Sequence, residues 1–161
     1  MRSIIVNATK LWNDYNNYDY WAEILWAGSV AHNDMLGVGR KQSWVSHGLE
    51  HELSAIYDIA HGQGLAIIFP AWMKTVYAQN TARFVQFATR VWDVDFACAE
   101  QEDIILEGIA RTERFFQSLQ LPVRLSEINI DHTHFEKMSK AVEQDKRTTY
   151  ALAMEVYQKA K

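Results

Sequence analysis

The stretch of residues 44–73, WVSHGLEHELSAIYDIAHGQGLAIIFPAWM, limits the fold more than any other part of the chain. Its apolar residues recur at steps of three and four, which is the spacing of a helix with one buried face. We expect a first helix over residues 44–57, capped by Ser43 or Ser46, and a second helix after it. Almost no run in the chain alternates with period two. The sequence therefore predicts an all-α fold, a helical bundle of about seven helices in a single domain over residues 1–161.

Three of the chain's six histidines lie inside this stretch, in a run of only fifteen residues. His47 and His51 are four residues apart, so on a helix they lie one turn apart on the same face, as a metal ion or a proton relay requires. His61 precedes Gly62 and Gly64, which indicate a turn or a close backbone approach, so the second helix should begin there. Two antiparallel helices joined at this point would bring His61 toward His47. The same histidines also fit half-buried polar positions of an ordinary helix.

The pentapeptide HGLEH at residues 47–51 also matches the H-x-x-E-H pattern of inverted zinc proteases. In that pattern the histidines bind zinc and the glutamate activates water. A protease would need a third ligand from a downstream helix, and this interpretation gives His61 no role. A zinc metallopeptidase is thus one alternative. The downstream carboxylates that could supply its third ligand are Glu100, Glu102, Glu107 and Glu113.

Residues 46–73 resemble the histidine motif of the iron-containing (group III) alcohol dehydrogenases, especially the bacterial NAD(P)H-dependent butanol dehydrogenase branch. The matching features are the spacing from His47 to His61, the intervening His51, the glycine after His61 and the PAWM ending. The resemblance covers most of the chain, as the helical C-terminal domain of a two-domain enzyme. It implies that His47 and His61 are two of four ligands of a divalent metal, iron in the family, with zinc or nickel as alternatives. It also implies that His51 is an unligated histidine beside the metal and a candidate proton relay.

The family's other two ligands, an Asp and a His four residues later, come from a helix upstream of the position that matches His47. No Asp in this chain is followed by a His four residues on, and the nucleotide-binding domain is also absent. We therefore expect a truncated chain, inactive alone, from a metal-dependent oxidoreductase that interconverts a small alcohol and an aldehyde. Its nicotinamide cofactor, NAD(H) or NADP(H), would bind through the missing domain. The second alternative is a non-catalytic helical interaction module.

The composition of the chain restricts its partners. A formal charge of −4 without a Lys and Arg cluster argues against nucleic acid, because phosphate binding needs concentrated positive charge. No segment approaches eighteen uncharged apolar residues, so we expect no membrane partner. The single cysteine, Cys98, cannot form an internal disulfide, and we expect a small buried residue in a cytoplasmic protein. With 12% aromatic residues the chain should expose apolar surface, and we expect it to form a homodimer.

Two further polar runs have simpler explanations than a binding site. Asp93 and Asp95 supply too few oxygen ligands for a loop that binds a hard cation. We expect them to cap the start of a long helix. His132 and His134 are expected to be surface residues, because alternate positions on a helix point to different faces.

Overall fold

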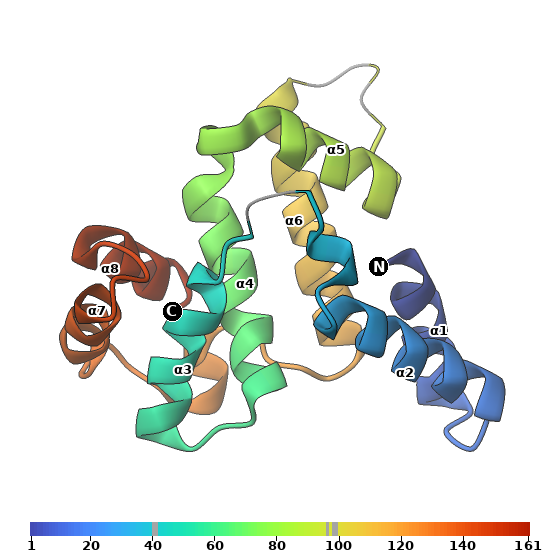
Figure 1. Ribbon diagram of the computed structural model, residues 1–161, viewed down its shortest axis with the longest axis horizontal. Helices are drawn as coiled ribbons and strands as arrows, with labels where there is room; N and C mark the ends of the chain where they lie inside the picture. Colours follow the sequence, from blue (N-terminus) through green and yellow to red (C-terminus); the bar gives the residue numbers. More distant parts are fainter. Residues whose placement is uncertain (40–41, 96, 98–99) are drawn as a thin grey trace. The chain divides into compact units, whose positions relative to one another are not determined.

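The computed structural model of the chain describes residues 1–39, 42–95, 97 and 100–161. These residues form eight α-helices and three short 3-10 helices and contain no β-strand (Figure 1). The all-α prediction is confirmed, whereas Cys98 lies outside the described residues. The α-helices are α1 (Arg2–Asn13), α2 (Tyr18–His32), α3 (Val45–Tyr57), α4 (His61–Val76), α5 (Thr81–Trp92), α6 (Gln101–Ser118), α7 (Phe135–Gln144) and α8 (Tyr150–Lys159). The 3-10 helices are η1 (Met35–Gly37), η2 (Tyr77–Asn80) and η3 (Leu125–Ile128).

The chain divides into two compact units, Met1–Ser43 and Trp44–Lys161. The first unit contains α1 and α2, which pack against each other. The side-chain oxygen of Asn17 accepts hydrogen bonds from the backbone N–H groups of Asp19 at 3.1 Å and Tyr20 at 3.3 Å. This cap satisfies two N–H groups that a helix start otherwise leaves without a partner, so it fixes where α2 begins.

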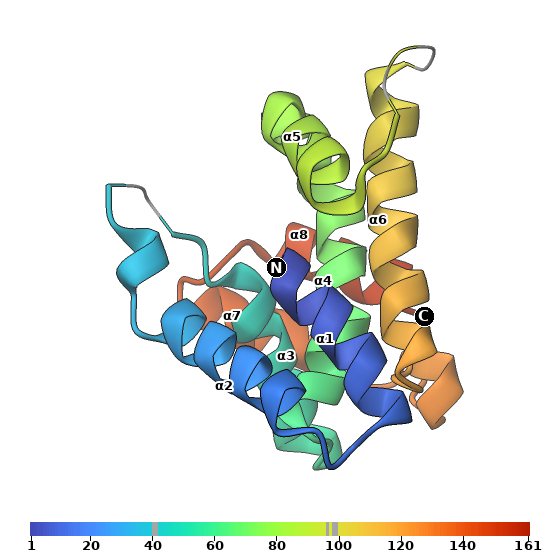
Figure 2. The same cartoon turned by 90° about the vertical axis from the view of Figure 1, so that its right-hand side faces the viewer.

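The second unit is built around α3 and α4, which pack against each other and against α7 and α8 (Figures 1 and 2). Tyr157 of α8 donates its hydroxyl to the backbone carbonyl of Leu49 in α3 at 2.8 Å, which holds α3 from its buried side. Burial, and then the nearby carboxylates of Glu52 and Glu50, raise the pKa of Tyr157. The core around this contact is apolar and includes Leu49, Leu53, Ile67, Ile68, Leu125, Met138, Val142, Val156 and Tyr157.

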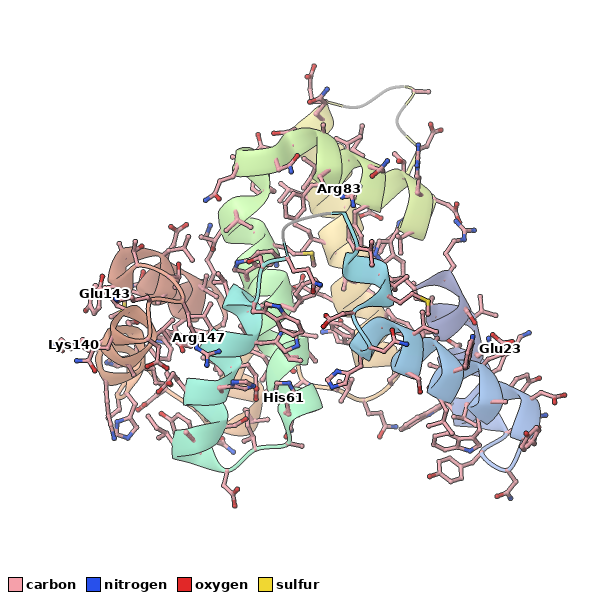
Figure 3. The ribbon with its side chains drawn as sticks, in the orientation of Figure 1. Glu23, His61, Arg83, Lys140, Glu143 and Arg147 are labelled. Atoms are coloured by element: carbon pink, nitrogen blue, oxygen red, sulfur yellow. The ribbon has the colours of Figure 1, made fainter. Side chains whose placement is uncertain are left out.

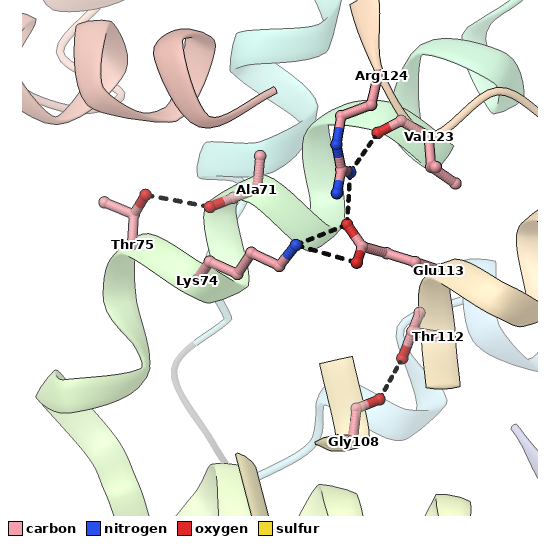
Figure 4. A network of polar contacts seen from close by, with 8 residues as sticks. All are labelled: Ala71, Lys74, Thr75, Gly108, Thr112, Glu113, Val123 and Arg124. Atoms are coloured by element: carbon pink, nitrogen blue, oxygen red, sulfur yellow. Dashed lines mark hydrogen bonds and ion pairs between the residues drawn. The ribbon is translucent and has the colours of Figure 1, made fainter. Parts of the chain in front are cut away.

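Helix α6 packs against both α4 and α5. A Cβ atom on Gly108 would lie 2.5 Å from the Cβ of Ala88, so this glycine is what lets α6 approach α5 so closely. A partly buried polar network links α6 to α4 (Figure 4). In it, Lys74 Nζ donates to both oxygens of Glu113 at 2.8 and 2.9 Å, and Arg124 donates to the same carboxylate at 2.6 Å.

The environment of Glu113 has two opposing effects on its pKa. Burial alone would raise it, but the hydrogen bonds and positive charges of Arg124 and Lys74 outweigh burial. The pKa of Glu113 is therefore lower than that of an ordinary glutamate, and the carboxylate stays charged between α4, α6 and the segment before η3.

The structure corrects two of the expected helix caps. The residue that precedes α3 is Trp44, which makes no side-chain cap, and Ser46 is buried inside the helix, so neither expected serine caps it. Asp93 ends α5 in the left-handed region, at φ 53°, whereas α6 begins only at Gln101, so Asp93 does not start a helix. Asp is one of the few residues that adopts this conformation readily. None of the described helices has the length and apolarity needed to cross a membrane.

Candidate metal centre

Helix α3 carries a stripe of polar residues at steps of three and four. His47, Glu50, His51 and Ser54 therefore share one face of the helix. The helix ends at Tyr57, and the next residue, Asp58, takes up the left-handed conformation that reverses the chain. Its backbone N–H bonds to the carbonyl of Ser54, which closes the last turn.

Helix α4 begins at His61, as predicted, only three residues after Asp58. Figure 3 shows His61 at the N-terminal end of α4, beside α3. The short connection keeps the start of α4 close to α3, and Nδ1 of His61 contacts Glu50 of the polar stripe. The two glycines that follow have different surroundings: a Cβ on Gly62 would meet nothing within 4 Å, whereas a Cβ on Gly64 would meet the side chain of Glu50.

Three imidazole rings converge where α3 meets the start of α4. The ring centroids of His47 and His61 are 5.5 Å apart, and those of His51 and His61 are 5.2 Å apart. Trp44 packs its ring edge against His47, with centroids 4.9 Å apart. The His61 side chain is 48% exposed and His51 is exposed as well, so these two rings are accessible from solvent.

Glu50 lies directly beneath this histidine cluster and is completely buried. One carboxylate oxygen accepts a hydrogen bond from the hydroxyl of Ser54, and the other contacts Nδ1 of His61. A Cβ on Gly64 would lie 2.7 Å from Cγ and 2.9 Å from Cδ of Glu50, so the carboxylate occupies the space that a side chain at position 64 would fill. The buried carboxyl group is thus enclosed by α3 on one side and α4 on the other.

The group of three donor atoms that could hold a metal ion differs from the pair implied by the family resemblance. One donor atom each from Glu50, His51 and His61 lie within 4.8 Å of one another, a separation that a metal ion could bridge. The resemblance instead assigns His47 and His61 to the metal and His51 to proton transfer. His61 is common to both arrangements, and its ring centroid lies 5.5 Å from that of His47 and 5.2 Å from that of His51.

Sequence reasoning gave Glu50 a role only in the peptidase interpretation. That interpretation needs its carboxylate free to activate water, but the carboxylate is buried between Ser54 and His61, so the geometry does not fit a peptidase. Three of the four downstream carboxylates have other partners: Glu113 pairs with Lys74 and Arg124, Glu107 pairs with Arg111 and Arg114, and Glu102 accepts a hydrogen bond from the hydroxyl of Tyr77. The spacing of Glu50, three residues after His47 and four before Ser54, indicates only that it shares their face of the helix and does not reveal its contact with His61.

Comparison with known proteins identifies the family of the chain. The sequence model of the C-terminal part of the Fe-containing alcohol dehydrogenase family matches residues 1–156. A relative from Bacillus subtilis (strain 168), the probable NADH-dependent butanol dehydrogenase 1, is 42% identical over 139 residues, which are 86% of this chain and 36% of that relative. The chain thus spans about a third of the length of the curated relatives it matches.

Solved structures match the fold over almost the whole chain. The substrate- and cofactor-free form of the aldehyde reductase YqhD from E. coli superposes with a TM-score of 0.93 at 30% identity, over 99% of this chain and 44% of that one. NADH-dependent butanol dehydrogenase A from Thermotoga maritima superposes with a TM-score of 0.91 at 32% identity, over 99% of this chain and 43% of that one. The chain belongs to the Fe-containing alcohol dehydrogenase family and corresponds to the C-terminal domain of its members.

Proposed function

We propose that this chain is the metal-binding part of an NAD(P)H-dependent oxidoreductase that interconverts a small alcohol and its aldehyde. The observation that carries the proposal is the convergence of His47, His51 and His61 above the buried carboxylate of Glu50. The names of the relatives, butanol dehydrogenases and an aldehyde reductase, support the substrate class.

The donor set fits a divalent transition metal. Imidazole nitrogen binds iron, zinc and nickel, and His47 and His61 together would supply two such ligands. A bound metal would act as a Lewis acid on the substrate oxygen. His61 is held by Glu50, and His47 is covered on one side by Trp44, so both rings have restricted orientations. His51 is exposed beside them, where a ring nitrogen can give a proton to the substrate oxygen or take one from it.

Part of the proposed enzyme lies outside these 161 residues. The family resemblance assigns two further metal ligands and the NAD(H) or NADP(H) site to an upstream segment. Hydride transfer requires the reactive carbon of the cofactor to lie against the substrate. We therefore propose that catalysis needs this chain together with a family-like N-terminal half.

A homodimer in the cytoplasm is part of the same proposal. Several large apolar side chains of α2 are exposed, among them Tyr18 at 81% and Trp26 at 71%, and exposed apolar surface favours contact with a partner. A second copy is one way to cover such a surface. Light scattering during size-exclusion chromatography should report twice the mass of one chain, and the mass of a single chain would contradict this part of the proposal.

The experiment that tests the activity is a complementation assay. The chain is joined to the N-terminal half of the butanol dehydrogenase from Bacillus subtilis, and butanal reduction is followed with NADH and with NADPH. Turnover should appear only in the joined protein, because holding the cofactor in the correct orientation can lower the activation barrier by roughly 7 to 11 kcal/mol. His47→Ala and His61→Ala should abolish it, whereas His132→Ala, at an exposed position outside the cluster, should not. Robust turnover that survives the first two substitutions would contradict the metal assignment.

A further inference from the structure

The buried position of Glu50 is not explained by a structural ion pair. A buried carboxylate is costly unless it is paired, and buried acidic groups are normally matched by Lys or Arg. Among the residues that the structure describes, no ion pair joins Glu50 to a Lys or an Arg, and its ionisable partner is His61. Glu113 is the contrasting case, because two basic side chains hold it. The chain thus keeps one buried carboxylate whose partner is an imidazole at the candidate metal centre.

Two roles are open to a carboxylate in this position: to bind the metal directly or to orient a histidine that binds it. Both oxygens of Glu50 already have a partner, the hydroxyl of Ser54 for one and His61 for the other, and this favours the orienting role. The contact is made by Nδ1 of His61, which leaves Nε2 on the far side of the ring, away from Glu50. A histidine whose second nitrogen is bonded to a carboxylate is the arrangement that fixes the tautomer of a metal ligand.

We propose that Glu50 is the positioning residue of the metal centre. Its carboxylate accepts the Nδ1 proton of His61 and so presents Nε2 as the metal-binding nitrogen. This inference rests on the proposed function, because it takes His61 as a metal ligand. Ser54 fixes the second oxygen of Glu50 and thereby its rotamer, while Gly64 leaves room for the carboxylate between the two helices. Glu50, Ser54 and Gly64 form one support for the imidazole of His61.

Imidazole nitrogen-15 NMR tests the inference directly on the metal-free 161-residue chain. In the wild type, the His61 ring should be protonated at Nδ1 at a pH where it is neutral. In Glu50→Ala the same ring should show a mixture of both tautomers, because nothing then selects Nδ1. Glu50→Gln should keep the wild-type tautomer, since its amide oxygen still accepts from Nδ1. A wild-type His61 protonated at Nε2 would overturn the inference.

Titration with Zn²⁺, followed by the same histidine signals, gives the second readout. Glu50→Ala should weaken binding by about 10- to 100-fold, which is the usual cost of losing the partner of a metal-binding histidine, and Glu50→Gln by less. Glu52→Gln is the matched control on the same helix and should bind as the wild type does. Equal Zn²⁺ affinity in the wild type and both Glu50 variants would overturn the positioning role and leave the proposed function standing. The absence of any Zn²⁺ response at His47 and His61 in the wild type would instead overturn the metal assignment of the proposed function.

A loss of folding in Glu50→Ala does not remove the test. Thermal unfolding of each metal-free variant identifies such a case, and Glu50→Met then takes the place of Glu50→Ala, because it keeps the length of the side chain but offers the Nδ1 proton of His61 no oxygen acceptor. A purely structural role of Glu50 would change the unfolding temperature without changing the tautomer of His61. That result would also overturn the inference.

Discussion

Gly64 of α4 directly faces the carboxyl group of Glu50 in α3. A Cβ atom at position 64 would lie 2.7 Å from Cγ and 2.9 Å from Cδ of Glu50, closer than such atoms approach in practice. The Glu50 side chain has little room to move, because it is fully buried and bonded to Ser54 and His61. The separation of α3 and α4 at the histidine cluster therefore depends on the absence of a side chain at this position.

Gly64→Ala should destabilise the protein and disturb the histidine cluster together. Overpacking of this kind costs about 1–3 kcal/mol. Urea denaturation measures the free energy of unfolding, and imidazole NMR reports whether His61 keeps its environment. Gly62→Ala is the matched control, because it lies in the same helical turn and its Cβ would meet nothing within 4 Å. It should leave stability unchanged or raise it by up to about 1 kcal/mol, and equal effects of the two substitutions would contradict the close packing.

The fold class and the location of the candidate site could both be predicted from the sequence. Apolar spacing gave the helices, and the glycines after His61 gave the start of α4, because both signals are local. The positions of His47, His51 and His61 on two adjoining helices also follow from local spacing. Their convergence needed only one further assumption, that α3 and α4 are antiparallel.

The role of Glu50 could not be predicted in the same way, because it depends on contacts between two helices. Nothing in the sequence near Glu50 shows that position 64 must leave space for its side chain or that Nδ1 of His61 points toward it. Asp93 was misplaced for another reason. An aspartate between two helical runs suits the end of one as well as the start of the next, and here it ends α5 in the left-handed region.

Glu113→Gln should destabilise the second unit at neutral pH, because it removes the negative charge that Lys74 and Arg124 both contact. Hydrogen bonds to a charged group contribute about 1.5–3 kcal/mol, which sets the expected loss. The pKa of Glu113 is lowered in the folded protein, so its contribution is present above the unfolded pKa, near 4.5, and is lost as the pH falls through the folded value. The wild-type and variant curves of unfolding free energy against pH should therefore converge in acid.

The control for this prediction is Glu136→Gln, since Glu136 forms an exposed pair with Lys140 on α7. An exposed pair of this type contributes little, so the substitution should hardly change stability at any pH. A constant difference between wild type and Glu113→Gln from neutral pH to acid would contradict the assigned cause, because it would show that the charge of Glu113 is irrelevant.

Tyr157→Phe should remove the hydrogen bond to the carbonyl of Leu49 and cost about 1 kcal/mol. The pKa of Tyr157 is raised in the folded protein, so its contribution is complete below the unfolded pKa, near 10, and is lost as the pH rises toward the folded value. The wild type should therefore lose its advantage over the variant above about pH 10. Urea denaturation at pH 7 and at pH 11 tests this, with the exposed Tyr18→Phe as control. An advantage that persists undiminished at pH 11 would argue against burial of the hydroxyl.

The last prediction separates the roles of the three histidines in the joined protein, by measuring bound metal and turnover in the same preparations. His47→Ala and His61→Ala should each lose metal, because each removes a proposed ligand. His51→Ala should keep its metal and still lose turnover, because general acid or base catalysis contributes about 10²- to 10⁴-fold. Added imidazole should restore part of that turnover, since a small base can occupy the space vacated beside His61. If His51→Ala loses metal as completely as His61→Ala while His47→Ala retains it, the ion is held by the closely spaced donors of Glu50, His51 and His61. His47 would then be left to pack against Trp44, and the ligand set of this chain would differ from the one implied by its family.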